Sequence, residues 1–414
     1  MELATDLLVA FVALYPVVTS AIWVVGGVLY GALEEHRPTR VPDVGWPGVT
    51  VLIPAYNEAS VIAASVRAAL ASDYPTLEVL VLDDGSTDGT AAIARAEAGG
   101  DRRCEIVRDP VNRGKAERLN AGFARARHDL VVVTDADAHL HPEAVALLVT
   151  RLLRSPLMAA VAGAPHVTNP SSILGLLQAM EAPSVIGLIR RTQALTGRVG
   201  TVAGVLGIFR RERVLAVGGY DGRMITEDID VSWRLLLAGW HTGYEPRALV
   251  GMEVPTTFSA LWAQRKRWAQ GQGEVLHKHG RSVTHWGNHR MWMLSIESVA
   301  SMAWVGALVV AVAMAAFDLA LGGSFDQLYF GLAWGVAVSI LGTLQMAVGL
   351  RLESGYDPRA FRAFLLGPLY PLAFWMLSAA ASLRSQGVGL AVGPHDRRVG
   401  WDVPREQLWQ QADL

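Results

Sequence analysis

The sequence predicts an α/β domain attached to a set of membrane-spanning helices. Short β-branched runs alternate with Ala-rich stretches of helical character in the first part of the chain. Polar side chains follow the ends of these runs, where ligands bind in open α/β sheets. The composition adds the membrane part, because 51% hydrophobic and 18% charged residues are too apolar for a wholly soluble chain of 414 residues.

The α/β pattern consists of four expected strands and three expected helices. The runs that predict strands are Val49–Pro54, Glu78–Leu82, Cys104–Arg108 and Leu130–Thr134. The stretches that predict helices are Ala59–Ala71, Ala91–Ala98 and Ala116–Ala126. Because the strand runs are continuously apolar, they predict a mostly parallel sheet that is covered on both faces. The pattern from Ala159 to Val250 is more irregular.

Four apolar stretches are each long enough to cross a bilayer, which takes roughly 20 residues. They are Leu7–Leu33, Met291–Phe317, Leu328–Leu350 and Ala363–Leu383. Arg37 and Arg40 follow the first stretch, so the positive-inside rule predicts an external N-terminus and a cytoplasmic α/β domain. Pro368 and Pro371 interrupt the last stretch, which leaves a bent or re-entrant segment and the side of the C-terminal tail open.

An amphipathic helix is expected at Pro255–His279, either along the membrane interface or packed in the core. Gln264, Arg267 and Trp268 share one face of this helix. Arg can clamp a diphosphate and Trp can stack on a sugar, but an interfacial Arg and Trp belt is the alternative. The expected organisation is an anchor and linker (1–46), the α/β domain (47–250), the amphipathic helix (251–290), membrane helices (291–385) and a tail (386–414).

Charge and cysteine content exclude two classes of protein. The net charge of −2 comes with no basic stripe, which argues against nucleic-acid binding. The single cysteine, Cys104, cannot form an intrachain disulfide and is expected to be a small strand residue.

Candidate nucleotide and metal ligands follow three expected strands. Tyr56 and Glu58 follow the first, and an aromatic ring there can stack on a base. Asp84 follows the second, where a carboxylate can accept hydrogen bonds from a nucleoside. Asp135 and Asp137 follow the fourth and offer hard oxygen ligands to Mg²⁺ or Mn²⁺ bound to a diphosphate. Taken singly, each cluster also fits an ordinary turn.

A candidate general base opens the helix expected after Thr226-Glu227-Asp228. Asp228 can take a proton from an acceptor hydroxyl as that oxygen attacks a sugar. The alternative is that acidic residues in a first helical turn suit the helix dipole.

In this order, these motifs resemble glycosyltransferase family 2 in its processive membrane branch. The groups concerned are Asp84, Asp135 with Asp137, Thr226-Glu227-Asp228, and Gln264 with Arg267 and Trp268. Longer stretches resemble the bacterial synthases of poly-β-1,6-N-acetylglucosamine; examples are Val185–Gln193, Met224–Asp230 and Tyr370–Trp375. The resemblance implies a GT-A fold, UDP-N-acetylglucosamine as donor, Mg²⁺ or Mn²⁺, and inversion at the anomeric carbon. It also implies a growing polysaccharide that leaves through the bacterial cytoplasmic (inner) membrane.

The resemblance assigns roles to residues of this sequence. Nucleotide-sugar binding is expected from Tyr56, Glu58, Asp84, Lys115, Asp135, Gln264 and Arg267. Catalysis is expected from Asp228 and Glu227, metal binding from Asp137, and acceptor binding from Trp268 and Gly204. Lys115 fits a solvated loop equally well. Ala203 stands where the family is expected to have Ser, which leaves acceptor details open.

Partners and competing functions stay open at this point. Glu297 lies inside an expected span and is expected to line a path or contact a subunit, because ionisable groups there are costly. A small membrane subunit is therefore left open as a partner, beside the lipid bilayer. The alternatives are a cellulose-, chitin- or hyaluronan-like synthase, a non-processive transferase that forms a glycolipid, and a membrane channel or scaffold with an inactive transferase domain.

Overall fold

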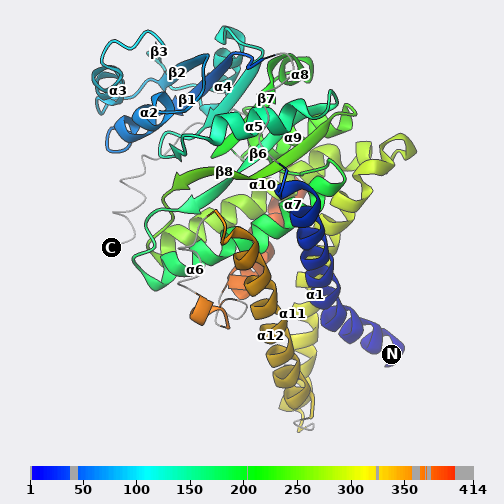
Figure 1. Cartoon of the computed structure of the whole chain (residues 1–414). Helices are drawn as coiled ribbons and strands as arrows, with labels where there is room; N and C mark the ends of the chain where they lie inside the picture. The colour runs from blue at the N-terminus through cyan, green and yellow to red at the C-terminus, as the bar shows by residue number, and fades with distance from the viewer. Residues whose placement is uncertain are drawn as a thin grey trace.

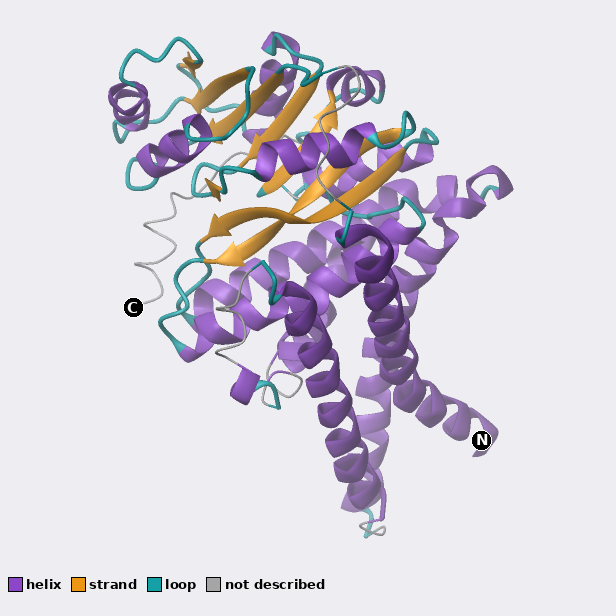
Figure 2. Ribbon diagram, in the orientation of Figure 1, coloured by secondary structure: helices purple, strands orange, loops and turns teal. Residues whose placement is uncertain are grey.

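The protein is an α/β domain stacked on long helices that project from one side, as seen in a computed structural model (Figure 1). The structure describes residues 2–37, 45–202, 204–322, 326–356, 364–368, 370 and 374–396. In Figure 2 the sheet occupies the upper part of the molecule, and α1, α11 and α12 extend away from it.

The sheet has eight strands, and the first four that the sequence predicts are confirmed. Their order across the sheet is β3-β2-β1-β4-β7-β6-β8-β5. The strands are β1 (Val49–Ala55), β2 (Leu77–Asp84), β3 (Cys104–Asp109), β4 (Leu130–Thr134), β5 (His139–Leu140), β6 (Met158–Val167), β7 (Leu206–Arg210) and β8 (His241–Met252). Strands β1, β2 and β4 are buried along their whole length, as continuously apolar runs predict.

The sheet is mostly parallel, as predicted: β1, β2, β3, β4, β6 and β8 run in one direction, and β7 and β5 run antiparallel to their neighbours. One expectation about the second half of the domain is wrong. The stretch from Ala159 to Val250 is regular: besides β6, β7 and β8 it contains α8 (Arg211–Ala216) and α9 (Glu227–Leu237). Its strand β6 is rich in Ala and carries few β-branched residues, so the local strand signal is weak although seven of its residues are buried.

Two hydrophobic clusters cover the two faces of the sheet. One contains α2 (Ile62–Leu70), α3 (Thr90–Ala98) and α5 (Ala144–Leu153); the other contains α4 (Lys115–Arg125) and α9. Alternate residues of each strand join opposite clusters: Val51 and Ile53 of β1 join the first, and Leu52 joins the second. Because helices cover both faces of the sheet, the carboxyl ends of the parallel strands are held next to one another along one edge of the sheet.

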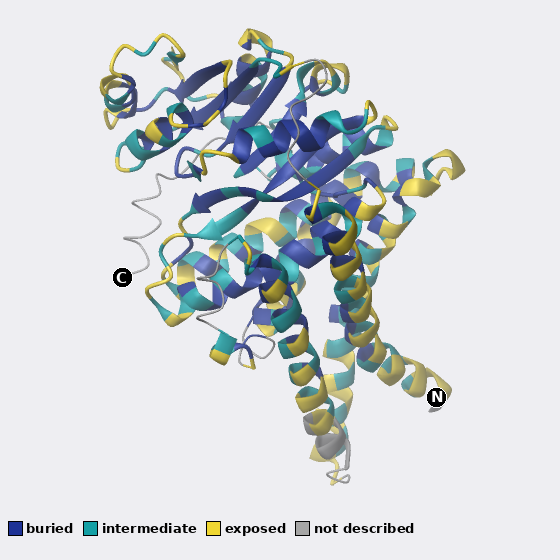
Figure 3. Ribbon diagram, in the orientation of Figure 1, coloured by how far each residue is buried: buried dark blue, intermediate teal, exposed yellow. Residues whose placement is uncertain are grey.

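Within the part of the chain that the structure describes, four helices are long and apolar enough to cross a membrane. Three agree with expected spans: α1 (Glu2–Tyr30) with the π-helical turn Gly31–Glu35, α11 (Trp292–Ala320) and α12 (Asp326–Glu353). Figure 3 shows many exposed residues on them. The fourth runs through α6 (Ile173–Glu181), the π-helical segment Ala182–Gly187 and α7 (Leu188–Leu195). Its most apolar window is 56% buried, and it packs against α1 and β8, so we assign it to the domain.

The expected span Ala363–Leu383 stays a prediction, since residues 357–363, 369 and 371–373 lie outside the described ranges. The described part that follows contains α13 (Met376–Ala381), the π-helical segment Ser382–Gln386 and α14 (Gly387–Val392). These segments pack along α10 (Phe258–Thr284), the helix expected at Pro255–His279. Both faces of α10 therefore contact protein, with Leu261 in one hydrophobic cluster and Val275 in another.

A buried ion cluster ties the domain to two of the helices that could cross a membrane. Arg191 of α7 is fully buried, and its Nε lies 2.5 Å from Oε1 of Glu35. Its Nη2 lies 3.0 Å from Oε1 of Glu353, at the end of α12. Tyr356 donates its hydroxyl to the other oxygen of Glu35, at 2.7 Å. One guanidinium thus joins α1, α7 and α12.

Arg191→Met should lower the stability of the whole protein. The variant leaves two buried carboxylates without their cation, which costs about 3–5 kcal/mol. The measurement is thermal unfolding in detergent. The matched control is Arg67→Met, which removes an ion pair with Glu97 at the surface, where solvent screens the two charges. Equal unfolding temperatures for the two variants would contradict the stabilising role of the ion cluster at Arg191.

Candidate active site

The loops that follow β1 and β2 are joined by hydrogen bonds. Asn57 has a positive φ of 53°, and its N–H donates to Oγ of Ser86 at 3.0 Å. The N–H of Glu58 donates to Oγ1 of Thr90 at 2.9 Å. These bonds hold Tyr56 and Glu58 beside the end of β2. Because β1, β2 and β4 are parallel neighbours, their carboxyl ends form one edge, where nucleotides bind in such sheets.

Asp84 is fully buried and holds the start of α4. Its Oδ1 accepts the N–H of Arg113 at 2.9 Å, and its Oδ2 accepts the N–H of Gly114 at 2.7 Å. Arg118 approaches Oδ1 at 3.2 Å. Burial raises the pKa of Asp84, and these donors oppose that rise. Asp84 therefore positions Lys115, the first residue of α4, and its expected contact with a nucleotide stays a prediction.

Lys115 joins the acidic clusters of two different elements. Its Nζ lies 2.6 Å from Oδ1 of Asp135 and 3.7 Å from Oε1 of Glu227. Burial alone would lower the pKa of Lys115, but Asp135 and Glu227 outweigh burial and raise it. The alternative of a solvated loop lysine is therefore wrong.

The catalytic pair expected at Glu227 and Asp228 opens α9. Oδ2 of Asp228 accepts the N–H of Gly204 at 3.3 Å. Burial raises the pKa of Glu227; the charge of Lys115 opposes the rise and that of Asp228 adds to it. A Cβ at Gly204 would stand 2.8 Å from Nζ of Lys115. Gly204 thus allows the loop before β7 to approach the ion pair closely, whereas Ala203 lies outside the described residues.

The residues present fit a hard divalent cation that binds together with a diphosphate. Asp137 is buried after β4, two residues beyond the Lys115-bound Asp135. Among the described residues, no group of three or more His, Cys, Asp and Glu side chains is placed to hold a metal. Mg²⁺ commonly takes only one or two protein carboxylates and completes its shell with phosphate oxygens and water. Asp137 can supply such a ligand.

Helix α10 brings the Gln264, Arg267 and Trp268 motif towards the acidic residues. A Cβ on Gly271 would collide with the side chain of Thr226, next to Glu227. Three residues further on, Oε2 of Glu274 accepts the N–H of Ile225 at 3.1 Å. The motif lies one to two turns before Gly271 on the same helix.

Sequence reasoning missed a buried residue within this motif. Both terminal nitrogens of Arg265, Nη1 and Nη2, donate to the carboxylate of Glu181, and the distance from Nη1 to Oε1 is 2.9 Å. The guanidinium lies 4.7 Å from the ring centre of Trp268. Trp268 itself is 38% exposed. The helical spacing that places Gln264, Arg267 and Trp268 on one face does not include Arg265. Its ion pair with Glu181, the last residue of α6, could be found only from the structure.

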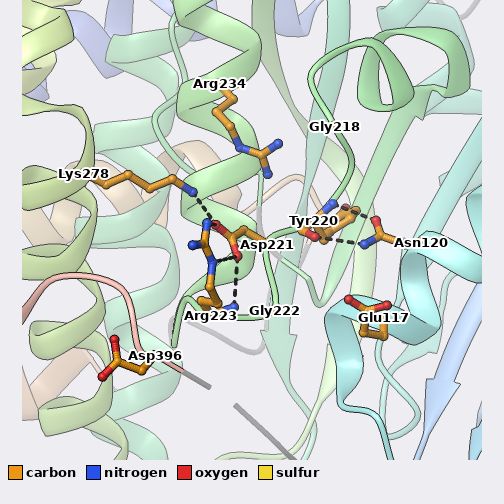
Figure 4. Close-up of a pocket in the computed structure, with 10 residues that line it drawn as sticks. All are labelled: Glu117, Asn120, Gly218, Tyr220, Asp221, Gly222, Arg223, Arg234, Lys278 and Asp396. Atoms are coloured by element: carbon orange, nitrogen blue, oxygen red, sulfur yellow. Dashed lines mark hydrogen bonds and ion pairs between the residues drawn. The ribbon is translucent and has the colours of Figure 1, made fainter. Parts of the chain in front are cut away.

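A separate cavity of about 550 Å³ lies between α4, α9 and α10 (Figure 4). Asn120 bonds to the backbone of Tyr220 on one side, and Lys278 pairs with Asp221 on the other. None of the predicted site residues lines this cavity. Arg223 and Lys278 of its lining both pair with Asp221. Since the predicted site residues lie elsewhere, we place the candidate active site at the strand edge.

The fold and this site define a glycosyltransferase of the GT-A class that acts on a nucleotide sugar. The sequence profile described as "Glycosyltransferase like family 2" matches residues 47–271, and the chain belongs to this family.

The relatives narrow the comparison further. The chain is 33% identical to the poly-beta-1,6-N-acetyl-D-glucosamine synthase of Staphylococcus epidermidis, over 89% of this chain and 92% of that one. The synthase of Staphylococcus aureus strain COL is also 33% identical, over 90% and 92%. In fold, the chain is similar to the mannosyltransferase PcManGT from Pyrobaculum calidifontis, solved in complex with GDP-Man and Mn²⁺. That match has a TM-score of 0.67 and 23% identity, and covers 92% of this chain and 98% of the other.

Lys115→Met should lower the rate of sugar transfer about 100-fold, because removal of one preorganised charge in an active site has an effect of that size. Asp135 and Glu227 would then repel each other with no cation between them. The measurement is release of the nucleotide from the sugar donor under saturating conditions. Arg125→Met is the matched control on the same helix, since Arg125 is exposed and pairs only with Glu105 among the described acids. An unchanged transfer rate for Lys115→Met would contradict the placement of the active site around Lys115.

Proposed function

We propose that this glycosyltransferase polymerises N-acetylglucosamine from UDP-N-acetylglucosamine into poly-β-1,6-N-acetylglucosamine. The observation that carries the proposal is one-third identity, along nearly the whole chain, to synthases named for that polymer. The match includes the membrane helices as well as the catalytic domain, which supports a common product rather than a shared fold alone.

We propose an inverting reaction in which Asp228 is the general base. Asp228 takes the proton from the acceptor hydroxyl, and that oxygen attacks the anomeric carbon from the side opposite to UDP. The bond between the sugar and UDP breaks, and UDP leaves. Lys115 holds Asp135 and Glu227 in place, and the half-buried carboxyl group of Glu227 lies next to the base in the sequence. Mg²⁺ or Mn²⁺, held by Asp137 with the diphosphate, would offset the charge on the departing UDP.

We propose that the enzyme lies in the bacterial cytoplasmic membrane with its catalytic domain in the cytoplasm, and that the polymer crosses the bilayer as it grows. The helices α1, α11 and α12 project from one side of the domain, next to α10 with its Trp268 motif (Figure 1). Glu297 of α11 accepts a hydrogen bond from Gln193 of α7 at 3.4 Å. It therefore contacts the domain, and its expected role on an export path or at a small subunit is part of this proposal.

The donor assay tests the proposed function. Purified protein in detergent receives radiolabelled UDP-N-acetylglucosamine, UDP-glucose or UDP-glucuronic acid, each with Mg²⁺ or with EDTA. We expect metal-dependent, high-molecular-weight product from the first donor alone, degraded by a β-1,6-specific hexosaminidase. Polymer from UDP-glucose would assign a cellulose-like synthase instead, and a single-sugar glycolipid would assign a non-processive transferase.

Asp228→Asn should lower transfer about 10²–10⁴-fold, the usual contribution of a general base. UDP binding, measured by calorimetry, should stay within about twofold of the native value, since the amide keeps the shape of the carboxylate. Loss of UDP binding together with transfer would contradict the assignment of Asp228 as the base.

Asp137→Ala should weaken UDP binding about tenfold or more in the presence of Mg²⁺, because the cation loses its protein ligand. The variant and the native protein should bind UDP with similar affinity in EDTA. Equal affinities in both conditions would remove Asp137 as the metal ligand.

Trp268→Ala should shorten the polymer, because the variant loses the large apolar ring that would stack on a sugar of the acceptor. Product length is measured by gel filtration of the labelled polymer. Trp286→Ala is the control, since Trp286 is exposed and lies beyond the end of α10. If both variants shortened the polymer equally, a general interfacial role of Trp would replace the acceptor role.

A further inference from the structure

Two adjacent arginines of α7 have different surroundings. Arg191 meets Glu35 and Glu353, as described above. Arg190 is also buried, with 8% of its surface exposed, but its recorded hydrogen bond is to a neutral atom, the backbone oxygen of Gly163 in β6, at 3.3 Å. Its guanidinium lies 5.9 Å from the ring centre of Tyr244. Within the described ranges, no carboxylate lies at ion-pair distance from Arg190.

A buried guanidinium with one neutral hydrogen-bond partner lowers the stability of the fold unless a ligand also binds it. A guanidinium carries five N–H donors, and a buried charge without a charged partner is strongly destabilising. One carbonyl oxygen at 3.3 Å satisfies only one of these donors. The remaining donors suit a ligand that carries several oxygen atoms.

Arg190 lies beside the catalytic base. A Cβ on Gly163, the residue that accepts the bond from Arg190, would collide with Leu206, two residues after Gly204. Gly204 in turn donates its N–H to Asp228. Burial lowers the pKa of Arg190, and the charges of Tyr244 and Asp228 oppose that lowering. Arg190 is therefore near the loop that carries Gly204 and near the carboxylate that takes the acceptor proton.

The position of α7 indicates which substrate reaches Arg190. Helix α7 packs against α1 on one side and β8 on the other, so it lies between the sheet and a membrane helix. The nucleotide edge is formed instead by the loops after β1 and β2. A polymer that leaves through the membrane must approach Asp228 from the side of the membrane helices, where Arg190 lies.

We propose that Arg190 binds the acceptor: its N–H groups donate to hydroxyl and acetamido oxygens of the polymer end whose hydroxyl Asp228 deprotonates. This inference rests on the proposed function, since it takes the acceptor to be an N-acetylglucosamine polymer. The donor nucleotide is not its ligand.

The experiment compares Arg190→Met, Arg190→Gln and Arg190→Lys with the native full-length protein in detergent. Three quantities are measured. They are the affinity for UDP, the rate at which water hydrolyses UDP-N-acetylglucosamine in the absence of acceptor, and the KM for a short β-1,6-linked N-acetylglucosamine oligosaccharide. Hydrolysis reports on the donor site and the base, so a merely structural loss would lower it. Arg210→Met is the matched control, because Arg210 donates to a backbone oxygen at the far end of β6, that of Met158.

We expect Arg190→Met and Arg190→Gln to raise the acceptor KM roughly tenfold or more, as loss of a charged hydrogen bond predicts. UDP affinity and hydrolysis should stay within about threefold, and Arg190→Lys should recover part of the acceptor KM. An acceptor KM within about twofold of the native value would overturn the proposal. So would weaker UDP binding, which would point to the donor phosphates, or hydrolysis and transfer that fall equally.

The two levels of the proposal fail in different ways. If the native protein uses another UDP-sugar, the proposed product is corrected, and the same measurements are made with that donor and its oligosaccharide. If Arg190→Met does not fold, Arg190→Lys and Arg190→Gln still separate acceptor binding from UDP binding.

Discussion

The candidate active site depends on one half-buried ammonium group, that of Lys115. Lys115 stands at 2.6 Å from Asp135 and at 3.7 Å from Glu227, and these acids come from segments about a hundred residues apart. Without a cation, acids this close together would repel one another and favour protonation. The lysine keeps its place because Asp84 fixes the start of α4 through two backbone N–H groups. The end of β2 thus positions a side chain that organises the ends of β4 and the start of α9.

A second constraint is the close approach of α10 to the catalytic turn. A Cβ at position 271 would collide with the side chain of Thr226, and a Cβ at position 273 would collide with the backbone of Gln386 and Leu390, so both positions require Gly. One helix therefore contacts the turn that carries Asp228 on one side and α14 on the other. Since Glu274 also accepts the N–H of Ile225, a shift of α10 would move the catalytic turn with it. The motif of Gln264, Arg267 and Trp268 and the proposed base, Asp228, therefore belong to elements that pack against each other.

Local patterns in the sequence were sufficient for the first half of the domain and for the acidic residues. The run that forms β4 is β-branched and fully buried, so both the strand and the Asp135-Asp137 pair that follows it were predictable. The pairing of Lys115 was not, because its position in the sequence fits a loop equally well. Strand β6 was missed because Ala and Gly carry little strand signal. The cluster around Arg191 joins residues 35, 191 and 353, and no local pattern connects segments that far apart.

The cluster at Arg191 has a consequence for the lipid environment. Glu35 and Glu353 sit at the ends of helices that project from the domain, and both pair with the residue next to Arg190. Membrane helices adjust to a thinner or thicker bilayer by tilting. A tilt of α1 or α12 would pull on the buried guanidinium and turn α7, the helix that carries Arg190 towards Asp228. Hydrocarbon thickness would then act, through this ion cluster, on the acceptor geometry that we propose.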